Sequence, residues 1–157
     1  MSIQKLIILI GLPGSGKSTF ADKLITCNPD YKLLSSNKFH AAFGTGEDDQ
    51  KVTGEVFDHI KKIVNLLLYK KYTVVIDATN INKKDRQDYI VTAKKFNVPV
   101  IGYDFICSRE TLIKRNVHRG ALGGRNVPTW VIDKMLAKYE KPSIEEGFDE
   151  YTAEFIL

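Results

Sequence analysis

The feature that most constrains the fold is a glycine-rich segment directly after the first apolar run. Residues 11–19 read Gly-Leu-Pro-Gly-Ser-Gly-Lys-Ser-Thr, and residues 5–10 before them read Lys-Leu-Ile-Ile-Leu-Ile. The pattern G-x-x-x-x-G-K-S in this context predicts a buried strand, a tight turn and a helix in immediate succession. Backbone N–H groups of such a turn converge on an anion, and the positive end of the helix dipole points to the same place. The segment therefore predicts a binding site for the phosphates of a nucleotide.

Each residue type in this loop has a chemical reason. Glycines at 11, 14 and 16 permit backbone angles and a close approach to a ligand that a Cβ would prevent. We expect Lys17 to reach the β- and γ-phosphates of a nucleoside triphosphate, and the Ser18 hydroxyl to ligate Mg²⁺. The expected nucleotide-binding residues of the loop are Gly14, Ser15, Gly16, Lys17, Ser18 and Thr19.

Apolar runs alternate with helical patterns over the rest of the chain. The expected strands cover residues 5–10, 31–35, 72–77, 98–105 and, at an edge, 152–157. The expected helices cover residues 18–27, 52–69, 83–96, 109–118 and 130–139, with a loop at 120–124. Strands that alternate with helices form a parallel sheet with right-handed crossovers, and ligands bind beyond the carboxyl ends of its strands. The fold class is therefore α/β, a P-loop core with a parallel sheet of about five strands flanked by helices.

The bulk composition is typical of one soluble domain that covers residues 1–157. The 157 residues, 43% of them hydrophobic, are enough to bury one core. No apolar run approaches the roughly 20 residues that a membrane span needs, so we expect a cytoplasmic protein with no membrane partner. Cys27 and Cys107 have no metal-binding spacing and are expected to be core thiols. Nothing in the sequence indicates an oligomeric state.

Charge is unevenly distributed toward the end of the chain. Residues 109–141 carry eight Lys and Arg against three Asp and Glu, whereas residues 142–157 carry five acidic residues and no basic one. Such a basic segment is typical of a surface that handles phosphates, although a solvated charged helix face gives the same pattern. Within it, Arg115 and Arg119 are four residues apart and share one face of the expected helix. Two guanidiniums so placed can neutralise the charge of a triphosphate.

Further polar groups follow the other expected strands. Residues 35–40 read Ser-Ser-Asn-Lys-Phe-His after the second strand, and residues 77–80 read Asp-Ala-Thr-Asn at the end of the third. Residues 49–54 read Asp-Gln-Lys-Val-Thr-Gly, and residues 115–119 read Arg-Asn-Val-His-Arg. In this order and spacing the chain resembles, nearly end to end, the kinase domain of the 5′-hydroxyl polynucleotide kinases of bacteriophage and of bacterial RNA-repair enzymes.

The resemblance implies an adenylate-kinase-like core in which the basic segment, approximately residues 109–127, forms a lid. It also implies transfer of the γ-phosphate of ATP to the 5′-OH end of a DNA or RNA partner, with Mg²⁺ as cofactor. By position, Lys17 and Ser18 correspond to the family's phosphate and magnesium ligands, and Arg119 corresponds to its lid arginine. Asp77 is expected to be either an outer ligand of the magnesium or a helix-capping or turn residue.

Two positions depart from the pattern of that family. The family carries an aspartate as general base where this chain has Asn37, and an arginine that contacts the acceptor-side phosphate where it has His40. Asparagine cannot accept a proton as a base, but its carbonyl oxygen can orient a hydroxyl. Because a general base contributes on the order of 10²–10⁴ in rate, we expect a slow kinase whose catalytic residues are Lys17, Asn37 and Arg119. The expected acceptor-binding residues are Lys38, His40 and Arg125.

Three functions stay open on the sequence alone. The first is a magnesium-dependent kinase of polynucleotide 5′-OH ends, in which Asp48 or Asp49 could replace the missing base. The second is a small-molecule kinase built on the same core. The third is an ATP-binding module with weakened or lost catalysis. Binding of a polynucleotide would weaken steeply with added salt, which separates the first function from the second.

Overall fold

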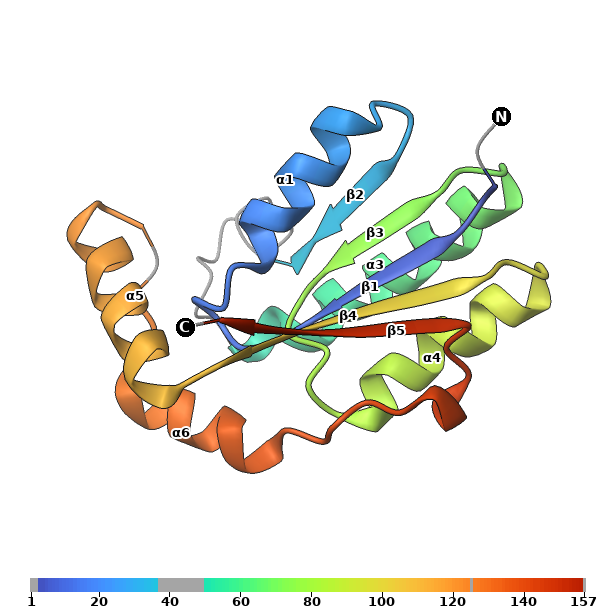
Figure 1. Cartoon of the computed structure of the whole chain (residues 1–157). Helices are drawn as coiled ribbons and strands as arrows, with labels where there is room; N and C mark the ends of the chain where they lie inside the picture. Colours follow the sequence, from blue (N-terminus) through green and yellow to red (C-terminus); the bar gives the residue numbers. More distant parts are fainter. Residues whose placement is uncertain (1–2, 37–49, 125, 157) are drawn as a thin grey trace.

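The computed structural model describes residues 3–36, 50–124 and 126–156 (Figure 1). Within these residues the strands form a five-stranded sheet in the order β2-β3-β1-β4-β5, and all neighbouring strands are parallel. The strands are β1 Leu6–Ile10, β2 Lys32–Ser35, β3 Val74–Asp77, β4 Val100–Cys107 and β5 Glu150–Ile156. The predicted α/β class and the predicted parallel sheet of about five strands are confirmed.

Helices cover both faces of the sheet. Those within the described residues are α1 Lys17–Cys27, α3 Gln50–Tyr69, α4 Lys83–Lys95, α5 Arg109–Ala121 and α6 Thr129–Lys138, with a 3-10 turn, η1, at Ile144–Glu146. One face packs against α3 and α4, and the other packs against α1. α5 and α6 lie beyond the carboxyl end of β4 (Figure 1). None of the helices in the described residues has the length and the hydropathy that are needed to cross a membrane.

β1 lies at the centre of the sheet, and all five of its residues are buried. Residues 6, 8 and 10 face α3 and α4, whereas residues 7 and 9 face α1. A strand that is buried on both faces needs an uninterrupted apolar run, which explains why 6–10 contains no polar side chain. Each such side chain stabilises the fold by about 1.5–3 kcal/mol. The chain therefore enters the glycine-rich segment from a rigid position.

Two local predictions were wrong. Residues 120–124 are not all loop, because α5 continues through Gly120 and Ala121. Asn126 packs so closely on Gly120 that a Cβ there would lie 2.7 Å from the Asn126 Cβ, and the backbone reaches a positive φ of 85° only at Gly123. Cys27 is exposed at the end of α1 and is not a core thiol, while Cys107 is partly buried.

The bounds of β4 and β5 differ from the prediction: β4 is shifted two residues toward the C-terminus, and β5 begins two residues earlier. β4 continues to Cys107, and β5 begins at Glu150. The two strands pair in register from Ile101 with Glu150 to Cys107 with Ile156. Backbone hydrogen bonds between the two strands therefore set where β4 ends and where β5 begins.

Candidate nucleotide-binding site

Residues 11–16, called the phosphate-binding turn below, connect β1 to α1. Gly11, Gly14 and Gly16 have φ values of 150°, 89° and 99°, in the region that favours glycine. The Gly11 N–H donates to the Thr79 carbonyl over 2.9 Å, which ties the turn to the segment after β3. Gly16 is the N-cap of α1, so unpaired N–H groups at the start of that helix point toward the turn. The geometry is that of a strand–loop–helix anion site.

Lys17 is the first residue of α1, and only 8% of it is exposed. Its Nζ donates to the Leu12 carbonyl over 3.2 Å. The ammonium is thereby held at the turn itself and does not extend into solvent. This is the place where the sequence predicts that Lys17 contacts the β- and γ-phosphates, and that contact stays a prediction.

Ser18 and Asp77 bring two oxygen ligands together beside the turn. Ser18 Oγ donates to Asp77 Oδ2 over 2.9 Å, and Asp77, the last residue of β3, is 6% exposed. Mg²⁺ prefers such hard oxygen ligands, and it usually binds one or two protein oxygens together with substrate phosphates. The donor set therefore fits the expected Mg²⁺. Among the described residues, no three His, Cys, Asp and Glu side chains come together as a metal site.

Asp77 does not cap either neighbouring helix. α1 begins after Gly16, and α4 is capped by Asn82, whose side chain accepts the Asp85 N–H over 2.8 Å. Asp77 instead contacts the residue that is predicted to ligate magnesium. Its action on the metal stays a prediction, but the capping alternative does not describe this chain.

Asn116 of α5 contacts the turn from the opposite side, and the sequence reasoning assigned it no role. It is 1% exposed, and its Nδ2 donates to the Pro13 and Leu112 carbonyls, each over 2.9 Å. A Cβ at Gly14 would lie 2.9 Å from the same Nδ2, so the turn and the amide are in close contact. The sequence did contain a signal for this contact: Asn116 is a polar residue four positions after Leu112, and therefore lies on the same face of the helix as that apolar residue.

Both arginines of the predicted pair lie near the turn. Arg115 Nη1 donates to the Gly14 carbonyl over 3.2 Å. Arg119 Nη2 donates to Asn116 Oδ1 over 2.6 Å, and the same Asn116 side chain donates to the Pro13 carbonyl of the turn. The predicted shared face of α5 is therefore directed at the phosphate-binding turn, and phosphate contact by the two guanidiniums stays a prediction.

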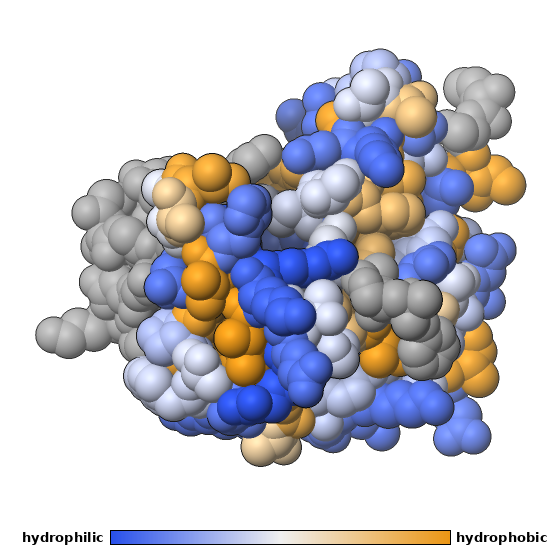
Figure 2. Space-filling view, turned by 60° about the vertical axis from the view of Figure 1, so that its left-hand side comes forward, coloured by the Kyte–Doolittle hydropathy of each residue, from blue (hydrophilic) through white to orange (hydrophobic). Residues whose placement is uncertain are grey.

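The surface around α5 combines charge and exposed apolar side chains. A hydrophilic band runs beside an apolar band on the face that carries this helix (Figure 2). Val117 and Leu122 are 59% and 75% exposed, and Trp130 at the start of α6 is 68% exposed. These residues fall in or beside the segment predicted to form a lid, a role that remains a prediction.

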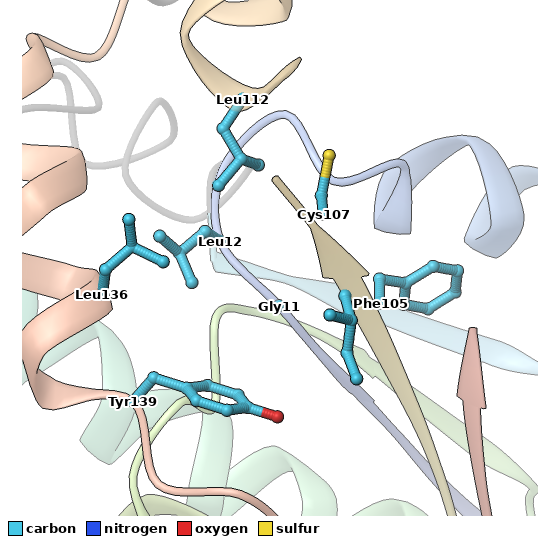
Figure 3. A pocket seen from close by; sticks show the side chains of 8 residues that line it. Gly11, Leu12, Phe105, Cys107, Leu112, Leu136 and Tyr139 are labelled. Atoms are coloured by element: carbon cyan, nitrogen blue, oxygen red, sulfur yellow. The ribbon is translucent and has the colours of Figure 1, made fainter. Parts of the chain in front are cut away.

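An apolar cavity of about 140 Å³ lies beside the first residues of the turn (Figure 3). Its walls come from the turn, β4, α5 and α6, and include Leu12, Cys107, Leu112, Leu136 and Tyr139. Burial raises the pKa of the Cys107 thiol, which therefore stays protonated at neutral pH. The Tyr139 hydroxyl donates to Asp104, whose pKa is raised by burial. A cavity without a charged wall does not suit a phosphate.

Four predicted site residues lie outside the described residues: Asn37, Lys38, His40 and Arg125. The alternative bases Asp48 and Asp49 lie outside them as well. β2 ends at Ser35, which pairs in register with Asp77 of β3. β2 thus ends beside the strand end that carries the Ser18–Asp77 contact.

Comparisons with known proteins place this geometry in a family. A family model described as AAA domain matches residues 6–142. L-seryl-tRNA(Sec) kinase of Methanococcus maripaludis is 28% identical over 148 residues, covering 92% of this chain and 56% of the relative. Bifunctional polynucleotide phosphatase/kinase of Schizosaccharomyces pombe is 27% identical over 146 residues, covering 92% of this chain and 32% of the relative.

A solved structure agrees with these relatives. The Pnkp1/Rnl/Hen1 RNA repair complex contains a chain that is 28% identical, with a TM-score of 0.76, over 88% of this chain and 44% of that one. This chain therefore spans about half, or less, of the length of the proteins it matches. Since the family model runs from β1 to beyond α6, the chain belongs to the AAA domain family and has the fold of a P-loop kinase.

Proposed function

We propose that this chain is an ATP- and Mg²⁺-dependent kinase that transfers the γ-phosphate to the 5′-OH end of a polynucleotide, in the cytoplasm. The observation that carries the proposal is the convergence on one turn of Lys17, the Ser18–Asp77 pair and the two arginines of α5. These are the groups that phosphoryl transfer requires for positioning and for charge neutralisation. They come from three separate elements, α1, β3 and α5, so their meeting is a property of the fold.

In this proposal the chain holds the donor from two sides. The N–H groups of the turn and Lys17 bind the β- and γ-phosphates, and Thr19 supports the turn. Ser18 would hold the magnesium, while Asp77 orients the Ser18 hydroxyl through their 2.9 Å contact. Mg²⁺, when bound, supplies neutralisation of the charge on the phosphate oxygens.

The arginines of α5 act on the charge that develops during transfer. A guanidinium carries five N–H donors, so Arg115 can donate to a phosphate oxygen while it keeps the Gly14 carbonyl. Arg119 is held one side chain further from the turn, on Asn116. Because the transition state is loose, fixing these charges matters more than activating the attacking hydroxyl.

The acceptor end is assigned from the resemblance. Asn37 orients the attacking 5′-OH through its carbonyl oxygen, and Lys38, His40 and Arg125 contact the acceptor strand. Without a carboxylate at position 37 the reaction is slow. We therefore expect Asn37→Asp to raise the initial rate of transfer by at least about tenfold at saturating ATP, because it restores a general base. Asn37→Ala is the control, and an equal gain in both variants contradicts the assigned role.

The names of two relatives support a nucleic-acid acceptor. One name contains polynucleotide and the other contains L-seryl-tRNA(Sec). The relative named L-seryl-tRNA(Sec) kinase favours a further candidate acceptor, a seryl-tRNA, which the same turn and arginines could serve. A small-molecule acceptor is the remaining alternative.

The test is transfer of label from [γ-³²P]ATP to matched acceptors. A 5′-OH DNA or RNA oligonucleotide should be labelled, whereas the same oligonucleotide with a 5′-phosphate should not. Labelling should weaken steeply between low and physiological salt. Basic side chains that bind the acceptor's phosphates displace counterions, and added salt opposes that displacement. Label on seryl-tRNA alone supports the second candidate, and label on no nucleic acid contradicts the proposed acceptor class.

A further inference from the structure

A buried ion pair lies next to the segment that connects β3 to α4. Arg86 of α4 donates to Glu146 of η1 through Nε and Nη2, over 2.8 and 3.1 Å. The two side chains are 0% and 2% exposed. Glu146 also accepts the Ser143 N–H over 2.9 Å, and its carbonyl accepts the Gln87 amide over 3.0 Å. The pair is therefore fully enclosed and held from several elements.

The pair is connected to the turn through Asn80. Arg86 Nη1 donates to the Asn80 carbonyl over 2.9 Å. Asn80 has a positive φ of 47°, and its Nδ2 donates to the Leu9 carbonyl of β1 over 2.8 Å. The preceding carbonyl, of Thr79, accepts the Gly11 N–H. Arg86 thus fixes a short segment whose other contacts are to Leu9, near the end of β1, and to Gly11, the first residue of the phosphate-binding turn.

The same segment begins with Asp77. Only Ala78 and Thr79 separate the carboxylate that contacts Ser18 from the residue that Arg86 holds. Asn80 adopts a left-handed conformation, which asparagine tolerates better than most residues with a side chain but which still gains from external support. The contacts of Arg86 and of the Asn80 side chain provide that support on both sides of the backbone.

Stability alone is a poor explanation for this pair. Removing two charges from water costs several kcal/mol per ion, and well-packed apolar residues of similar volume are often as stabilising. Arg109 and Asp133 form a pair of the same chemistry at the surface, 2.6 Å apart and about half exposed, without that desolvation. What the buried pair adds is a guanidinium fork that reaches a carboxylate and a backbone carbonyl at once.

We propose that Arg86, Glu146 and Asn80, the buried brace, position Asp77 and the phosphate-binding turn for Mg²⁺ and ATP. Arg86 is a positioning residue, because it contacts neither of the two predicted ligands directly. The inference rests on the proposed binding of Mg²⁺-ATP but not on the nature of the acceptor. Outer contacts of metal ligands are typically worth about 10–100-fold in metal affinity, and a contact one step further out should be worth about three- to tenfold.

The test separates position from stability. The double variant Arg86→Met, Glu146→Leu replaces both charges by apolar side chains of similar volume and removes the donor to Asn80. The measurement is the Mg²⁺ concentration at half-maximal ATP binding, by calorimetry, at a temperature at which circular dichroism shows complete folding. We expect this concentration to rise about three- to tenfold. The control Lys61→Gln, Asp88→Asn removes an exposed ion pair outside the expected lid and should leave this concentration unchanged.

Asn80→Gly provides a second arm that keeps the ion pair. Glycine accepts the positive φ but loses the bond to the Leu9 carbonyl, so it should also raise the half-maximal Mg²⁺ concentration. If the double variant does not fold, Asn80→Gly alone decides. A folded variant with the parent's Mg²⁺ dependence overturns the proposal. If the parent protein itself binds no Mg²⁺-ATP, the proposed function fails, which is a distinct result. If the parent binds Mg²⁺-ATP normally but labels no oligonucleotide, only the proposed acceptor is contradicted.

Discussion

On one side of the phosphate-binding turn, α5 holds the Pro13 and Gly14 carbonyls through Asn116 and Arg115. On the other side, the buried brace holds the segment 77–80 through the Asn80 carbonyl. Both sides use side-chain donors on backbone oxygens, but the exposure of their guanidiniums differs. Arg115 is exposed, whereas Arg86 is 0% exposed.

Under the proposed function, this difference in exposure matches a difference in task. An exposed guanidinium remains hydrated and can change partners when a triphosphate arrives. A buried guanidinium cannot leave its carboxylate without a large penalty, so it keeps its place during the reaction cycle. The α5 side thus combines an exposed guanidinium, Arg115, with a buried amide, Asn116, whereas the guanidinium of the buried brace, Arg86, is fully buried.

The largest effect is expected from breaking the buried side. Arg86→Met leaves the Glu146 carboxylate buried and unpaired, which should lower the free energy of unfolding by about 3–5 kcal/mol. Urea denaturation followed by circular dichroism measures this loss. Arg109→Gln, at the exposed ion pair, should leave the urea midpoint almost unchanged. Equal shifts in the two variants would show that burial does not distinguish the pairs.

The next effect separates ligand contact from support. Lys17→Ala removes one preorganised donor and should lower the rate of γ-phosphate transfer by on the order of 10²–10³. The free energy of unfolding should fall by only about 0.5–1.5 kcal/mol, for the lost hydrogen bond to the Leu12 carbonyl, in contrast to Arg86→Met. Lys23→Ala, on the exposed part of α1, is the matched control. A variant at position 17 with the parent's rate and ATP affinity would remove the basis of the proposed function.

The smallest effect is expected on the α5 side. Asn116→Ala takes the amide donor away from the Pro13 carbonyl, so the free energy of unfolding should fall by about 1–3 kcal/mol. The Michaelis constant for ATP should rise as well, because Arg119 loses its acceptor. Val117→Ala, one residue along and 59% exposed, should change neither quantity. A fall in stability as large as that of Arg86→Met would make the two sides of the turn equivalent.

Local sequence was enough for the elements whose pattern is strictly local. The apolar run 6–10, the glycines of the turn and the Lys-Ser pair predicted the strand, the turn and the start of α1, and all are present. The end of α5 was predicted wrongly, because glycine at 120 signals a loop locally while Asn126 packs on it in three dimensions. Asn116 was noted only as part of the 115–119 segment, without a role, and Arg86 was not singled out, since a single polar residue in a helix carries no sign of its partner.

By itself, then, the sequence determined which segment faces the phosphates and in what order strands and helices alternate, because these depend on neighbours a few residues apart. Only the tertiary structure decided that Ser18 meets Asp77, that Asn116 reaches Pro13, and that Arg86 supports Asn80 with Glu146. The partners in these contacts lie far apart in the sequence: 59 residues for Ser18 and Asp77, 103 for Asn116 and Pro13, and 60 for Arg86 and Glu146. At such separations, contacts are set by strand order and by the packing of helices on the sheet, which no local pattern encodes.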